Sequence, residues 1–105
     1  MPALLTPERL AEAMLTLPAW TSEGGSIRRE LRAATASALA ELLLEIARVS
    51  DALDHHPDVE WSAAKASIRL WTHDAGGLTE LDLELAAAID ARVAAAGFGD
   101  APRRG

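Results

Sequence analysis

The chain has 105 residues, of which 50% are hydrophobic, and it carries a net charge of −6 at pH 7. This length fits one domain with a single core, and the acidic balance argues against a nucleic-acid backbone or an anionic membrane as the main partner. The absence of cysteine excludes disulfides, thiolate nucleophiles and Cys-based zinc sites. No apolar run reaches the roughly 18 residues of a membrane helix, and the N-terminus lacks the features of a secretory signal. We therefore expect a cytoplasmic protein that does not contact a membrane.

The N-terminal segment predicts a helix over residues 7–17. Thr6 is suited to cap this helix, and Pro18 should end it because the residue before a proline disfavours the helical conformation. Residues 20–32 then predict two short strands around a turn at residues 23–26, since paired glycines supply positive φ angles at little steric cost.

A long helix is predicted over residues 34–53. Its large apolar residues recur at spacings of three and four, which places them on one face, and we expect this face to pack in the core. The residues of this stripe are Leu39, Leu42, Ile46, Val49 and Leu53. Asp51 and Asp54 stand at the C-terminal end, where an acid opposes the helix dipole. Such a local conflict is expected where function overrides stability.

The C-terminal half predicts a hairpin followed by a last helix. Strands are expected over residues 59–63 and 65–72. The last helix should begin after Thr79, with Asp82 three residues later as its capping partner, and end at Gly97.

The order of these elements is helix, strand, strand, helix, strand, strand, helix. It predicts an α+β fold of two layers, in which a four-stranded antiparallel sheet has its helices packed on one face. We expect a single domain over residues 1–96 and a flexible C-terminal tail over residues 97–105.

All three histidines, His55, His56 and His73, fall in two loop-like segments flanked by carboxylates. Histidine has an unperturbed pKa of about 6.5, which lets it give and take a proton near neutral pH, so the pattern favours acid–base chemistry. A metal site is the rival interpretation, although adjacent histidines rarely point at one ion and the chain has no helical His-x-x-x-His pair. The structural alternatives are a polar helix stop at His55 and His56 and a strand-end role for His73.

Two motifs surround these histidines, and a third precedes the first predicted strand. They are Leu17-Pro18-Ala19-Trp20, Asp51-x-x-x-His55-His56-Pro57-Asp58, and Thr72-His73-Asp74-Ala75-Gly76-Gly77-Leu78-Thr79-Glu80-x-Asp82. In these motifs and in the order of its predicted elements, the chain resembles the pterin-4a-carbinolamine dehydratase family. The resemblance covers roughly residues 4–96, which is nearly the whole chain.

The resemblance implies an activity, an assembly and a site. Members of the family dehydrate 4a-hydroxytetrahydropterin to quinonoid dihydropterin, which recycles the pterin cofactor of aromatic amino acid hydroxylases, and they use no metal and no cofactor. They share an antiparallel sheet with helices on one side and associate as homodimers or tetramers. The vertebrate member is also a dimerisation partner of a transcription factor. Carried onto this chain, the resemblance implies catalytic roles for His55, His56 and His73, and substrate contacts from Asp51, Trp61, Thr72 and Asp82.

Within this site, we hypothesise that His55 and His73 form the acid–base pair and that His56 binds and orients the pterin. Asp51, four residues before His55, is expected to accept a hydrogen bond from it. Asp82 is expected to act first as a helix cap. Trp71 is expected at an interface between subunits.

The chain departs from the family pattern beside this pocket. Val59 stands where the family often has an aromatic residue, and we expect Trp61 to fill that role. Ala63 and Ala64 replace a frequent Tyr-Asn pair. These changes keep a second function open, that of a non-enzymatic interaction or assembly factor built on a dehydratase-like domain. The presence of all three histidines favours the enzyme.

Overall fold

The computed structural model describes residues 3–98 and contains three α-helices, four strands and one 3₁₀ helix. In chain order these are α1 (Pro7–Met14), β1 (Thr21–Glu23), β2 (Ser26–Arg32), α2 (Ala36–Leu53), β3 (Asp58–Ser62), β4 (Lys65–Leu70), the 3₁₀ helix η1 (His73–Ala75) and α3 (Glu80–Ala95). Within residues 3–98, no helix combines the length and the apolar character needed to cross a membrane.

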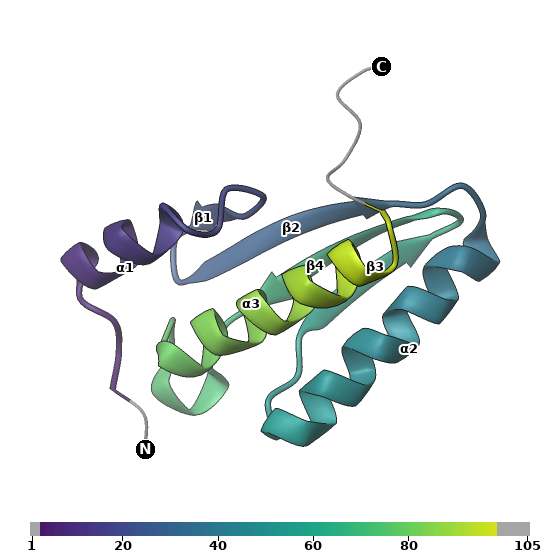
Figure 1. The fold of residues 1–105 in the computed structure, drawn as a ribbon. Coiled ribbons are helices and arrows are strands. Elements are labelled where there is room, and N and C mark those ends of the chain that lie inside the picture. The colour runs from purple at the N-terminus through teal and green to yellow at the C-terminus, as the bar shows by residue number, and fades with distance from the viewer. Residues whose placement is uncertain (1–2, 99–105) are drawn as a thin grey trace.

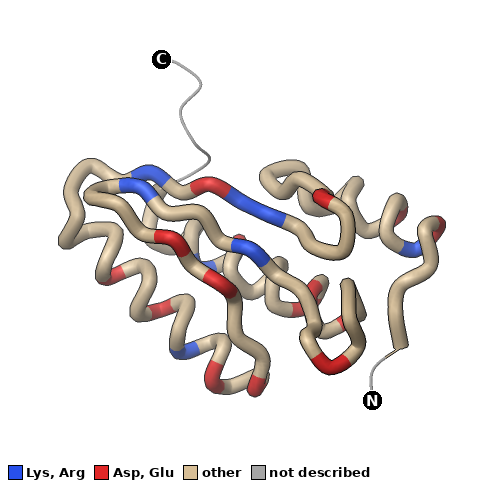
Figure 2. Tube along the Cα trace, turned by 180° about the vertical axis from the view of Figure 1, so that it is seen from behind, with Lys and Arg blue, Asp and Glu red and all other residues tan. Residues whose placement is uncertain are grey.

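The strands form one antiparallel sheet in the order β1-β2-β4-β3, so β4 lies between β2 and the edge strand β3. Figure 1 shows α2 and α3 side by side across one face of this sheet. The opposite face, seen in Figure 2, carries acidic and basic residues along β2, β4 and β3. The predicted two-layer α+β fold is confirmed.

Helix α1 begins as predicted but ends three residues early. The Thr6 hydroxyl accepts a hydrogen bond from the backbone N–H of Arg9 at 3.0 Å, which caps the first turn. The helix ends at Met14 rather than near residue 17, because the backbone and the hydroxyl of Thr16 both bond to the carbonyl of Ala13. The tighter turn that results carries Leu17 into the core, where 4% of its surface remains exposed.

Helix α2 packs its apolar stripe against the sheet, as the spacing predicted. Leu39, Leu42 and Ile46 are almost fully buried, whereas Val49 and Leu53 are half-buried against the same cluster. Thr35 caps the helix by accepting a hydrogen bond from the N–H of Ala38 at 3.1 Å.

The end of β4 differs from the prediction. The strand ends at Leu70 rather than at residue 72, because the backbone of Thr72 pairs with Gly77 and closes a short loop around η1. Asp82 and Thr79 form the expected capping box at the start of α3. Beyond α3, the side chain of Phe98 packs against the core, and the rest of the expected tail lies outside the described residues.

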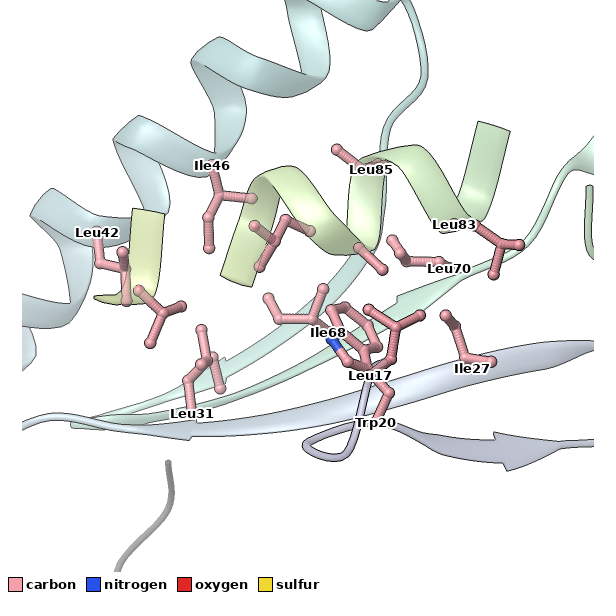
Figure 3. Packing of buried hydrophobic residues seen from close by; sticks show 14 of the residues in the cluster. Leu17, Trp20, Ile27, Leu31, Leu42, Ile46, Ile68, Leu70, Leu83 and Leu85 are labelled. Atoms are coloured by element: carbon pink, nitrogen blue, oxygen red, sulfur yellow. The ribbon is translucent and has the colours of Figure 1, made fainter. Parts of the chain in front are cut away.

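The core fills the space between the sheet and the two long helices (Figure 3). It contains one charged residue of β2, Arg29, whose side chain is 4% exposed and forms an ion pair with Asp90 of α3. The same carboxylate accepts a hydrogen bond from the indole N–H of Trp20 at 2.8 Å. A buried charge is tolerated when it is paired in this way, which explains how an arginine occupies an inward position of the strand.

Candidate active site

The three histidines lie together in one cleft. The end of α2 and the loop after β4 lie at the same end of the domain (Figure 1), so segments 17 residues apart in sequence form its two sides. The cleft has a volume of about 320 Å³. Its lining consists of Asp54, His55, His56, Trp71, Thr72, His73, Asp74 and Leu81.

The C-terminus of α2 directs the adjacent histidines in opposite ways. Asp54 adopts the left-handed conformation, with φ 52° and ψ 42°, and the N–H of His55 bonds back to the carbonyl of Ser50 at 3.0 Å. The helix stops there, and Pro57 leads the chain into β3. After this reversal the His55 side chain is only 11% exposed, whereas that of His56 is 54% exposed.

His55 is fixed by a fully buried carboxylate from α3. Its Nε2 lies 2.6 Å from Oδ1 of Asp82, whose side chain has no exposed surface. The other oxygen, Oδ2, accepts hydrogen bonds from the hydroxyl of Thr72 at 2.8 Å and from the N–H of Thr79 at 2.9 Å. Asp82 is therefore a helix cap and a histidine partner at once, and its carboxylate joins the start of α3 to the segments that follow α2 and β4.

The tautomer of His55 follows from this contact. A carboxylate only accepts hydrogen bonds, so Nε2 carries the proton that it donates to Asp82. The other ring nitrogen, Nδ1, is then the one that can accept a hydrogen bond. This is the arrangement in which a buried acid orients a histidine for proton transfer.

The hypothesis that Asp51 serves His55 is wrong. Asp51 instead pairs with His56, whose Nε2 lies 2.8 Å from its Oδ1, and both side chains are more than half exposed. The physical reason is the left-handed turn at Asp54, which rotates His55 toward α3 and leaves His56 beside the last turn of α2. The aspartate that holds His55 comes instead from a position 27 residues later in the chain.

His73 enters the cleft from η1 and is 62% exposed. Its ring stacks on Trp71, with 4.0 Å between the ring centroids and 29° between the planes. Its Nε2 lies 4.0 Å from Oδ2 of Asp58, and that same oxygen accepts a hydrogen bond from the indole N–H of Trp71 at 3.0 Å. The sequence motifs included Asp58 without assigning it a contact, and Trp71 was expected at a subunit interface; the structure places both side chains beside His73.

Trp61 lies outside the histidine cleft. Its indole N–H donates to the carbonyl of Ala63 at 2.7 Å, and 53% of its surface is exposed. Side chains alternate between the faces of a strand, so Val59 and Trp61 point to the side of α2 while Asp58 points to the open face. The two apolar residues line a separate groove of about 420 Å³ between α2 and β3, which reaches His56 at one end.

The sequence-based site residues thus separate into three groups. The cleft is lined by His55, His56, His73 and Thr72. Asp82 contacts His55 from the buried side, and Asp51 contacts His56 at the exposed rim. Trp61 lies in the separate groove between α2 and β3. Within residues 3–98, no group of three or more His, Cys, Asp or Glu side chains is arranged to hold a metal ion.

The fold and the site define a small α+β protein with histidine–carboxylate pairs at one end of its sheet. Comparison with known proteins gives the family. The sequence model of the family described as "Pterin 4 alpha carbinolamine dehydratase" matches residues 3–92. The chain belongs to the pterin-4a-carbinolamine dehydratase family, as its motifs predicted.

Individual relatives agree over almost their whole length. Proteins provisionally named pterin-4-alpha-carbinolamine dehydratase, from Chloroflexus aurantiacus and Roseiflexus castenholzii, are 41% and 37% identical over 90 residues, which are 86% of this chain and 96% and 97% of theirs. A crystal structure titled transcriptional coactivator/pterin dehydratase, from Brucella melitensis, superimposes with a TM-score of 0.81 at 27% identity. That match covers 85% of this chain and 97% of the other.

Proposed function

We propose that this protein dehydrates a 4a-hydroxytetrahydropterin to the quinonoid dihydropterin, in the recycling of a pterin cofactor. The observation that carries the proposal is the cleft in which three histidines converge and one of them, His55, is locked to a buried aspartate. Family membership supports the substrate class, because the match spans 90 of the 105 residues.

The reaction needs two proton transfers and little else. The ring nitrogen beside C4a loses a proton, the C4a–O bond breaks, and the hydroxyl takes up a proton and leaves as water. The elimination of water involves no net oxidation or reduction, so the proposed reaction requires no redox cofactor. A well-placed general acid or base typically contributes about 10²–10⁴-fold in rate.

The contacts favour different roles for the three histidines. Nδ1 of His55 is the acceptor nitrogen, and the buried carboxylate on the other side of the ring stabilises the imidazolium that forms, which suits a general base. His73, which lines the cleft with its Nε2 4.0 Å from Oδ2 of Asp58, is assigned the role of the general acid that gives a proton to the leaving hydroxyl. His56, on the rim with Asp51, is assigned to binding and orienting the pterin.

The test is stopped-flow dehydration of freshly generated 4a-hydroxytetrahydropterin by the wild type and by His55→Ala, His56→Ala and His73→Ala. We expect kcat to fall by about 10²–10⁴-fold for His55→Ala and His73→Ala, and KM to rise for His56→Ala. Leu15→Ala is the control, because Leu15 caps the C-terminus of α1, is 83% exposed and does not line the cleft. A wild type without activity would refute the proposal and favour the non-enzymatic interaction factor.

A further inference from the structure

Trp71 makes three contacts that hold its ring in one place. The indole N–H donates to Oδ2 of Asp58 on the edge strand β3 at 3.0 Å. The guanidinium carbon of Arg69 lies 5.6 Å from the ring centroid, within the range of a cation–π contact. The third contact is the stacked imidazole of His73. Trp71 is thus held by residues of two strands, β3 and β4, in addition to its contact with the histidine.

His73 depends on this ring for its orientation. His55 has a hydrogen bond of 2.6 Å to a buried carboxylate, whereas the nearest carboxylate to His73 is Asp58, at 4.0 Å. The His73 side chain belongs to η1 and is 62% exposed, so more than one rotamer is sterically open to it. In the rotamer that the structure shows, the ring stacks on Trp71 and lines the cleft.

The local backbone brings the two rings together. Trp71 follows β4 and continues the alternation of Arg69 on the open face of the sheet, while Thr72 points inward and bonds to Asp82. The pairing of Thr72 with Gly77 then folds η1 back, so that the side chain two residues after Trp71 returns over its ring. The stack follows from the sheet register and the short loop.

We propose that Trp71 is a positioning residue for the dehydration: it holds the His73 imidazole in the reactive orientation, and Asp58 anchors Trp71 through the indole N–H. The inference rests on the proposed function, because it assigns His73 a part in that reaction. Trp71 acts here through the histidine. A misplacement of a reacting group by about 1 Å is enough to lower a rate by about 10²-fold.

A double-mutant cycle tests whether Trp71 acts through His73. In the wild-type background, Trp71→Ala should lower kcat by about 10- to 100-fold and change KM by less than about 3-fold, and Trp71→Phe, which keeps an aromatic face, should recover part of the rate. In the His73→Ala background, Trp71→Ala should have almost no further effect. If the tryptophan change lowers kcat by the same factor in both backgrounds, the inference is wrong.

A second measurement needs no activity. The ring protons of a stacked imidazole experience the ring current of the indole, so the His73 signals in an NMR spectrum should move on Trp71→Ala and, to a smaller extent, on Asp58→Ala. Trp61→Ala is the matched control, because Trp61 lies outside the cleft, and it should leave them unchanged. Identical His73 signals in the wild type and Trp71→Ala would overturn the stack.

The two measurements separate failure of the inference from failure of the proposed function. An active wild type with an additive cycle refutes the positioning role alone. If the wild type is inactive but the His73 signals move on Trp71→Ala, the proposed reaction is refuted, and with it the role of Trp71 in that reaction. The contact between the two rings is then still supported.

Discussion

Asp82→Asn tests the link between the buried carboxylate and the histidine that it orients. The two carboxylate oxygens of Asp82, one of which becomes an amide nitrogen, have separate partners: Oδ2 accepts from Thr72 and Thr79, and Oδ1 faces His55. The amide oxygen of asparagine keeps two hydrogen bonds if it takes the place of Oδ2, and only one if it takes that of Oδ1. The amide nitrogen should therefore face His55.

The magnitudes for stability and activity diverge as a result. Hydrogen bonds to a charged group contribute about 1.5–3 kcal/mol each and neutral ones about 1 kcal/mol, so weakening the two retained bonds should lower the free energy of unfolding by about 1–4 kcal/mol. The amide N–H₂ only donates, so Nε2 of His55 must accept and its proton must move to Nδ1. With the base nitrogen blocked, kcat should fall by about 10²–10⁴-fold.

Urea unfolding, stopped-flow dehydration and ¹⁵N NMR of the His55 ring measure the three expected effects. The control is Asp51→Asn, which removes the charge of the exposed carboxylate that pairs with His56. It should change the free energy of unfolding by less than about 1 kcal/mol. An Asp82→Asn protein that is folded and has kcat within about 3-fold of the wild type would refute the role of Asp82 in orienting His55.

Backbone strain, an exposed ion pair and the subunit assembly each give a further expectation. Ala63→Gly should raise stability by about 0.5–1 kcal/mol in thermal unfolding, because Ala63 has a φ of 54°, whereas Ala64→Gly should lower it. Arg9 holds the pKa of Glu80 below its usual range through a hydrogen bond, so this pair stabilises the fold above the unfolded pKa of about 4.3. That contribution is lost as the pH falls through the lower folded pKa, so wild type and Glu80→Gln should converge in urea unfolding in acid, and an unchanged gap would contradict this. Light scattering should find a dimer or tetramer, and a monomer would contradict the family-based expectation.

The fold was predictable because its signals are local. The cap at Thr6, the capping box at Thr79 and the apolar stripe of α2 each depend on residues within a few positions of one another. The predicted ends of α1 and β4 were wrong because a nearby hydrogen bond, which the apolar spacing does not reveal, ended each element early. The hydroxyl of Thr16 shortens α1, and the pairing of Thr72 with Gly77 ends β4 early.

The sequence by itself determined the layers, the family and the identity of the three histidines. Only the tertiary structure decided how they are paired. The left-handed residue Asp54 turns His55 away from the nearby Asp51 and toward Asp82 on another helix, and the strand register sets Asp58 beside Trp71. Hydrogen-bond partners depend on the direction in which side chains leave the backbone, and one turn or one strand face changes that direction. The spacing of residues along the chain does not predict this direction.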